Sequence, residues 1–212
     1  MPRAEARDVR VEHDLLGDRE IPAHAYWGVH TLRAVENFPI GLWPELVRAL
    51  ALVKHAAAQT NYELGLLDET KAKLIIAACR EIADGALHDE FVVDMIQGGA
   101  GTSTNMNANE VIANRALELA GRKKGDYAFL HPIEHVNMAQ STNDVYPTAL
   151  RLALRFAIVD LIAAMEELKV AFAAKSVEFR DLLKVGRTQL QDAVPMTLGQ
   201  EFSTFAVMLG ED

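Results

Sequence analysis

A long stretch of this chain, from about residue 142, contains no residue that would end a helix, and this limits the folds open to it. After Pro147 no helix-breaking residue occurs before Gly186, so residues 142–183 are predicted to form one helix of about 40 residues, roughly 60 Å long. Between residues 149 and 165 this helix is apolar nearly all round, which requires contact with other helices on more than one side. One isolated chain cannot supply that cover. The second half therefore reads as the start of a larger helical bundle.

Further helices are predicted on both sides of this stretch. Apolar residues recur at helical spacing over residues 44–64, and Asp68 is suited to cap a second helix that runs toward Gly85. A third is expected from within or just after a glycine-rich loop to Gly121, and another from near Pro195 onward, its pattern still running at residue 212. The predicted fold class is all-α, with a helical N-terminal domain over residues 1–140 and an incomplete bundle over residues 141–212.

Composition excludes several classes of function. The formal charge of −9 argues against a nucleic-acid footprint, and the short basic run at residues 122–124 reads as a solvated loop. No apolar segment is long and uncharged enough for a membrane span, and no secretory signal is recognisable. A single cysteine, Cys79, on an apolar helical face fits a reducing cytoplasm.

Three polar stretches stand out against this apolar background: residues 98–107 (GGAGTSTNMN), residues 141–144 (STND) and residues 186–192 (GRTQLQD). The first two precede predicted helices, where backbone N–H groups and the positive helix end can bind an anion. Glycine turns and Ser-x-x-Asp helix caps have the same composition, so each stretch taken alone is as well explained by capping. The third joins two predicted helices and could equally be a hydrogen-bonded corner with Arg187 and Asp192 paired.

The residues of these stretches, and the order of the stretches along the chain, resemble those of the aspartase/fumarase superfamily, and those of its ammonia-lyase branch most closely. Residues 14–22 (DLLGDREIP) and 25–34 (AYWGVHTLRA) are similar to the same family, so the resemblance covers the chain from about residue 9. It implies elimination across the C2–C3 bond of a dicarboxylate through an aci-carboxylate intermediate: L-aspartate would give fumarate and ammonia. Fumarate hydration is the alternative within the fold, and a non-catalytic dicarboxylate-binding or assembly fragment is the alternative from another class. Family members are considerably longer and form homotetramers, so the chain is expected to be an N-terminal portion, inactive or nearly so alone.

The resemblance also implies roles for matching residues. The carboxylate that becomes the enediolate would be held by Thr102, Ser141 and Thr142, and Asn143 would contact the amino group. The other carboxylate would be held by Thr188 and Gln189. Fumarases carry His where this chain has Gln189, which favours the ammonia-lyase reading, although some aspartases also carry His.

The chain departs from the family in one respect that concerns catalysis. The family's base is a serine in a Ser-Ser-x-Met-Pro-x-Lys-x-Asn motif, and the 212 residues contain no such motif. His131 and His135 are the remaining candidates for a base, but histidines at loop corners more often hold position. Their surrounding sequence, HPIEH, differs from the family pattern and puts a second anion site in doubt. No metal-ligand spacing is present, so no cofactor is expected; some aspartases respond to Mg²⁺, but no site is identifiable here.

Overall fold

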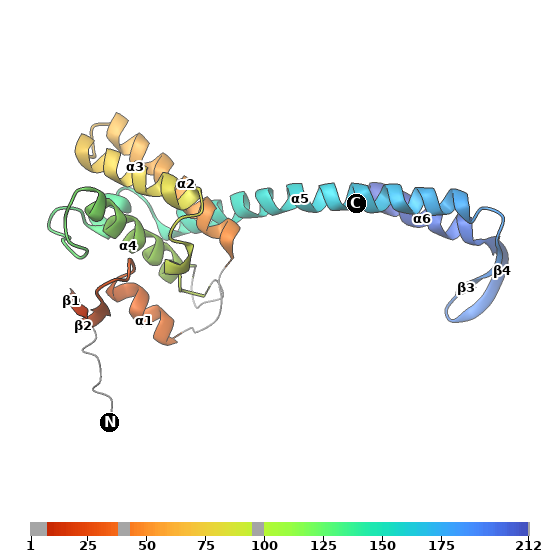
Figure 1. Cartoon of the computed structure of the whole chain (residues 1–212), viewed down its shortest axis with the longest axis horizontal. Helices are drawn as coiled ribbons and strands as arrows, with labels where there is room; N and C mark the ends of the chain where they lie inside the picture. The colour runs from red at the N-terminus through yellow and green to blue at the C-terminus, as the bar shows by residue number, and fades with distance from the viewer. Residues whose placement is uncertain (1–7, 38–42, 95–99, 212) are drawn as a thin grey trace, which may run out of the picture. The chain divides into compact units, whose positions relative to one another are not determined.

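The computed structural model describes residues 8–37, 43–94 and 100–211, and the chain divides into two compact units, residues 1–154 and 155–212. The division falls inside the long helix, so the domain boundary predicted near residue 141 stays a prediction. The first unit contains a β-hairpin, four complete helices, a short 3₁₀ turn, a π-helical turn and the start of the long helix (Figure 1). In chain order these are β1 (Val9–Asp14), β2 (Gly17–Pro22), α1 (Val29–Asn37), α2 (Pro44–Glu63), α3 (Glu69–Ala83), η1 (His88–Glu90), α4 (Thr102–Leu119), η2 (Pro132–Val136) and α5 (Thr142–Glu178).

The mostly helical, all-α fold class is confirmed, and the predicted helices of the first unit lie where the pattern placed them. Asp68 caps α3, because its Oδ1 accepts a hydrogen bond of 3.1 Å from the Lys71 backbone N–H. The core of this unit lies where α2, α3 and α4 pack together, and it includes fully buried Leu50, Ile75 and Ile112. The β1–β2 hairpin, α1 and η2 have no counterpart among the elements predicted from the sequence.

The second unit corrects two predicted boundaries. The long helix ends at Glu178, not near Leu183, and the helix expected from Pro195 begins three residues later, as α6 (Leu198–Glu211). Residues between the two helices form a second antiparallel hairpin, β3 (Leu183–Thr188) and β4 (Gln191–Thr197), in which Pro195 pairs with Val185. A two-stranded sheet has free edges, so a proline without an N–H is tolerated there. The start of α6 is a capping box, in which the Thr197 and Gln200 side chains each accept the other's backbone N–H.

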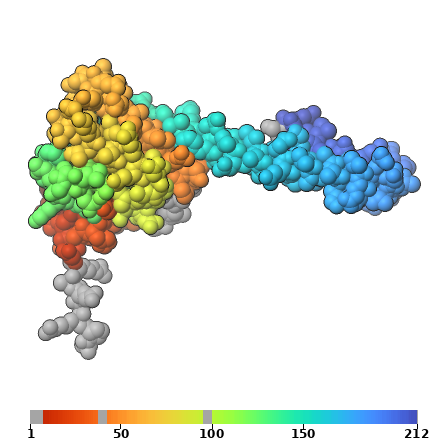
Figure 2. Space-filling view, turned by 45° about the horizontal axis from the view of Figure 1, so that its top comes forward, coloured from red at the N-terminus to blue at the C-terminus, as the bar shows by residue number. Residues whose placement is uncertain are grey.

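Inside the second unit α5 and α6 pack through an aromatic cluster of Phe172, Phe179, Phe202 and Phe205, whose neighbouring rings lie 5.3–6.0 Å apart. The rest of this α5 stretch is open on the face seen in Figure 2, where its atoms are cyan to blue. Large apolar side chains here are 45–71% exposed: Ile158, Val159, Leu161, Ile162, Leu168, Val170 and Val177. The predicted lack of cover along the long helix is thus present. No helix in the described part of the chain is long and apolar enough to cross a membrane.

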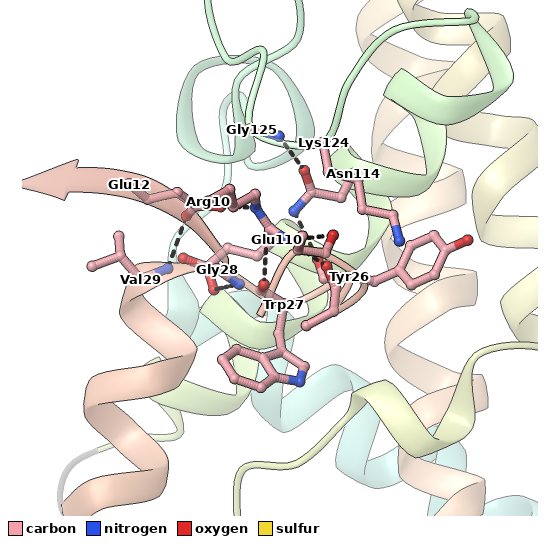
Figure 3. Close-up of polar contacts among 12 residues, drawn as sticks. Arg10, Glu12, Tyr26, Trp27, Gly28, Val29, Glu110, Asn114, Lys124 and Gly125 are labelled. Atoms are coloured by element: carbon pink, nitrogen blue, oxygen red, sulfur yellow. Dashed lines mark hydrogen bonds and ion pairs between the residues drawn. The ribbon is translucent and has the colours of Figure 1, made fainter. Parts of the chain in front are cut away.

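Residues 26–29, just before and at the start of α1, are fixed by a buried polar network (Figure 3). The Glu110 carboxylate, from α4, accepts hydrogen bonds from the backbone N–H groups of Gly28, His30 and Thr31, and Glu12 accepts from Val29. Carboxylates at a helix N-terminus satisfy its free N–H groups and oppose its positive dipole end. Burial raises the pKa of Glu110. The network therefore ties the N-terminal hairpin and α1 to α4.

Gly28 is predicted to be the least replaceable residue of this network. A Cβ at this position would lie 2.5 Å from Oε2 of Glu12 and 2.9 Å from the Tyr127 hydroxyl, both held by other hydrogen bonds. We expect Gly28→Ala to lower the free energy of unfolding by about 2 kcal/mol, as overpacking of a rigid site does. Urea unfolding measures this. Gly210→Ala is the matched control, since its Cβ would meet nothing closer than 3.6 Å, and an equal loss for both variants would contradict the explanation.

Candidate functional site

The first predicted site residue, Thr102, begins α4 directly after a glycine that no other residue can replace without strain. Gly101 has φ +81°, and an ideal Cβ there would lie 2.3 Å from Cγ of Tyr146. The Tyr146 ring, which comes from the first turns of α5, thus lies flat against the backbone at the α4 N-terminus. Thr102 itself is exposed. Residues 98–99 of the glycine-rich stretch lie outside the described residues.

The α5 N-terminus carries the second group of predicted residues. Ser141 precedes the helix and caps it: its Oγ accepts a hydrogen bond of 3.2 Å from the Asn143 backbone N–H. Thr142 is the first helical residue and is half-buried, whereas Ser141 and Asn143 are exposed. The capping interpretation of this stretch is therefore correct, and it leaves the Asn143 amide and the Thr142 hydroxyl at the same helix end.

Two contacts bring these helix ends together. One turn into α4, Asn105 donates from Nδ2 to the Thr142 Oγ1 at 3.2 Å, and one turn into α5, Tyr146 packs on Gly101. Two positive helix ends therefore meet at one place, which carries the hydroxyl-bearing residues Thr102, Ser141 and Thr142 and the Asn105 amide. Such an arrangement favours a negatively charged ligand. We call this place, defined by the first turns of α4 and α5, the paired helix ends.

A lysine that the sequence analysis did not single out lies beside the paired helix ends. Lys54 of α2 is 0% exposed, and its Nζ donates to Oδ1 of Asn137 at 2.8 Å and to Oε1 of Gln140 at 3.0 Å. Asn137 Oδ1 also accepts from Asn105 and Asn109. Burial lowers the pKa of Lys54 to about 7. The signal was present in the sequence, because Lys54 lies seven residues after Val47 and four after Leu50, on the apolar face of α2.

His131 and His135, the candidate bases within this chain, are both used to hold η2. The His131 Nδ1 accepts from the backbone N–H groups of Ile133 and Glu134, and the His135 Nδ1 accepts from the His131 N–H at 2.8 Å. The other ring nitrogen of His135 lies 2.8 Å from Nζ of Lys71. Burial and the neighbouring Lys71 lower the pKa of His135. This geometry favours the position-holding role over proton abstraction.

Thr188 and Gln189 lie in the second unit, at the tip of the β3–β4 hairpin. Gln189 has φ +53° and Leu190 has φ +62°, so both central residues of the turn are left-handed although neither is Gly, Asn or Asp. Two-residue turns of this kind normally carry Asn-Gly. Both side chains are exposed, and Arg187 and Asp192 form the predicted ion pair at 3.3 Å just behind the tip. A strained, exposed turn at residues predicted to bind a ligand is consistent with selection for function over stability.

The left-handed conformation of Leu190 leads to a testable prediction for the stability of the β3–β4 hairpin. Leu190→Gly relieves a left-handed leucine that contacts solvent, and we expect hairpin opening to become harder by about 0.5–1 kcal/mol. Hydrogen exchange of the β3 and β4 amides measures this. Gln191→Gly, one residue further in an ordinary strand position, is the control and is expected to weaken the hairpin. Faster exchange in both variants would show that the turn carries no strain.

No candidate metal-binding cluster is found in the described part of the chain. Among residues 8–37, 43–94 and 100–211 there is no group of three or more His, Cys, Asp or Glu side chains arranged to hold one. The chemistry available at the paired helix ends is instead that of neutral donors and helix dipoles, which bind and polarise carboxylates.

Comparisons with known proteins identify the family of the chain. A family model described as Lyase matches residues 17–212. The aspartate ammonia-lyase of Pseudomonas fluorescens is 61% identical over 98% of this chain and 44% of its own length, and that of Escherichia coli K12 is 54% identical over 98% and 45%. Among solved structures, fumarate lyase:delta crystallin from Brucella melitensis in native form has a TM-score of 0.89 at 59% identity, covering 96% of this chain and 48% of that one.

Class II fumarase from Schistosoma mansoni is also similar, with a TM-score of 0.86 at 37% identity over 96% of this chain and 44% of that chain. This chain thus spans less than half the length of the relatives it matches. The resemblance drawn from residues 98–107, 141–144 and 186–192 is confirmed. The chain belongs to the lyase family, with relatives named aspartate ammonia-lyase along nearly its whole length.

Proposed function

We propose that the protein to which this chain belongs is a carbon–nitrogen lyase that converts L-aspartate to fumarate and ammonia. The observation that carries the proposal is the meeting of two helix N-termini at Thr102, Ser141 and Thr142, in a chain 54–62% identical to aspartate ammonia-lyases. In the reaction a base removes a proton from C3, the electron pair forms the C2=C3 bond, and the C2–N bond breaks as ammonia leaves.

The difficulty of this reaction is the carbanion next to a carboxylate, and the paired helix ends suit it. As the proton leaves, negative charge moves onto the carboxylate oxygens and gives an aci-carboxylate with two charges. The hydroxyls of Thr102, Ser141 and Thr142 would donate hydrogen bonds to this charge, and the positive dipole ends of α4 and α5 would oppose it. Asn143 would contact the amino group. Thr188 and Gln189 would hold the second carboxylate.

The base is proposed to be a serine of the full-length protein that lies outside these 212 residues, because His131 and His135 hold η2. The proposed reaction also implies a ligand and an assembly. The ligand is a small dicarboxylate, the assembly is a homotetramer, and no cofactor is proposed. The exposed apolar side chains of α5 between Ile158 and Val177 support the assembly, because a face of this kind needs cover from other helices.

Fumarase is the second candidate, supported by the similarity to the Schistosoma fumarase. Gln189 opposes it, because the fumarase pattern has His at this position.

The deciding experiment supplies the full-length protein with L-aspartate and, separately, with L-malate, and follows fumarate by its ultraviolet absorbance. We expect fumarate from L-aspartate alone, and none from the 212-residue chain, which lacks the serine motif. Fumarate from L-malate alone would establish the fumarase reading. A full-length protein that binds fumarate but converts neither substrate would support the non-catalytic reading.

A further inference from the structure

We infer that Lys54 is the buried counter-charge of the dicarboxylate at the paired helix ends, and that it takes up a proton when the dicarboxylate binds. The inference rests on the proposed function and adds a group that does not touch the ligand. It follows from the surroundings of Lys54, from its connection to Thr142 and from the charge balance at this place.

Lys54 has hydrogen-bond partners but no anionic partner among the described residues. The side chain is fully buried, and among the described residues no carboxylate lies within ion-pair distance of Nζ, whose hydrogen-bond partners are two neutral amides. The titratable group facing it from α3 is the thiol of Cys79, whose pKa burial raises to about 12, so it stays uncharged. The hydrogen-bond partners of Lys54 among residues 137–140 are the amides of Asn137 and Gln140, and Asn137 accepts in turn from two amides of α4. A buried charge is retained at a cost unless something compensates it.

A short chain of hydrogen bonds connects Lys54 to the paired helix ends. The Lys54 Nζ lies 2.8 Å from Oδ1 of Asn137, which accepts from Asn105 Nδ2 at 3.1 Å, and the same Nδ2 donates to Thr142 Oγ1 at 3.2 Å. Two amides thus separate the ammonium group from a hydroxyl proposed to hold substrate. Over such a distance, in a water-poor interior, a cation and a dianion interact appreciably. The ligand would supply the negative charge that the two amide partners of Lys54 do not.

The pH dependence follows with a definite sign. Burial holds the pKa of the free Lys54 at about 7, and a nearby dianion raises it. Below pH 7 Lys54 is charged with or without ligand, so affinity is highest there. Above pH 7 the free protein loses the proton and must regain it to bind well, so dicarboxylate affinity falls as the pH rises. We expect the form with neutral Lys54 to bind roughly tenfold more weakly.

Calorimetry with fumarate as the probe, on the full-length protein in buffers of different ionisation enthalpy at pH 7.5, tests the inference. We expect net proton uptake by the wild type, less uptake and a Kd about threefold higher for Lys54→Met at this pH, where much of the free wild type is already neutral at Lys54, and no change for Lys73→Met, an exposed lysine on α3. Lys54→Met should melt no lower than wild type, because it removes a desolvated charge, whereas a merely structural lysine would lower the melting temperature without changing proton uptake.

Lys54→Arg gives a second readout that does not depend on the methionine variant folding. A guanidinium keeps its charge, so this variant should bind fumarate with a Kd that no longer rises between pH 7 and 9, whereas the wild-type Kd rises. Wild-type binding without proton uptake, or an unchanged Kd in Lys54→Met, would overturn the inference and leave the proposed function standing. A wild type that binds no dicarboxylate at all would overturn both.

Discussion

Thr142→Val in the full-length protein is expected to lower kcat/KM for L-aspartate by roughly 10²–10³-fold, the usual loss for one donor to a developing oxyanion. Valine keeps the shape of threonine but removes the hydroxyl that accepts from Asn105 and is proposed to face the substrate carboxylate. The loss should appear mainly in kcat, because this contact strengthens as the aci-carboxylate forms.

Steady-state kinetics on this variant should be read beside Thr148→Val, which removes an exposed hydroxyl from the same helix. The control is expected to retain activity within about threefold of wild type. Equal activity in both variants would remove Thr142 from the site. If Thr142→Val lowers the melting temperature as well as the activity, Thr142 would instead have a structural role.

Gly101→Ala is expected to cause the largest loss of stability, about 3 kcal/mol. The substitution forces alanine into a left-handed conformation at φ +81° and drives its Cβ into the Tyr146 ring. Because Tyr146 and Gly101 hold the paired helix ends together, activity should fall with stability. Urea unfolding measures the first effect and the fumarate assay the second.

Two further variants separate the causes. Gly65→Ala has a similar φ, +70°, with no atom near its Cβ, so it reports the cost of the backbone conformation alone, about 1 kcal/mol. Tyr146→Ala combined with Gly101→Ala should recover part of the loss, since it removes the ring that the new methyl group meets. A Gly101→Ala loss no greater than that of Gly65→Ala would show that the helix ends are not tightly packed there.

The sequence predicted the helical skeleton well where apolar periodicity and caps agree. Residues 44–64 and the cap at Asp68 are examples, and both depend on interactions within a few residues along the chain. The helix start predicted at Pro195 is wrong because it also rested on a local pattern. Proline is common at a helix start, but here Pro195 pairs with Val185 in a strand. The Thr197 and Gln200 capping box, also local, marked the true start of α6.

The sequence motifs predicted which residues belong to the candidate site, but they did not predict how those residues contact one another. The capping role of Ser141 follows from its neighbours, whereas the contact of Asn105 with Thr142 and of Tyr146 with Gly101 joins residues more than thirty positions apart. The apolar periodicity of residues 44–64 does not single out Lys54, because a lysine is not apolar although this one lies on the buried face of α2. Its partners, Asn137 and Gln140, follow η2 in a part of the chain where the sequence gives no periodic signal.

The most direct test of the account is a crystal structure of the full-length protein with fumarate bound. We expect a carboxylate of fumarate within hydrogen-bond distance of the Thr142 and Ser141 hydroxyls, at the N-terminus of α4. Fumarate bound only elsewhere, for example against η2, with water alone at the paired helix ends, would contradict it.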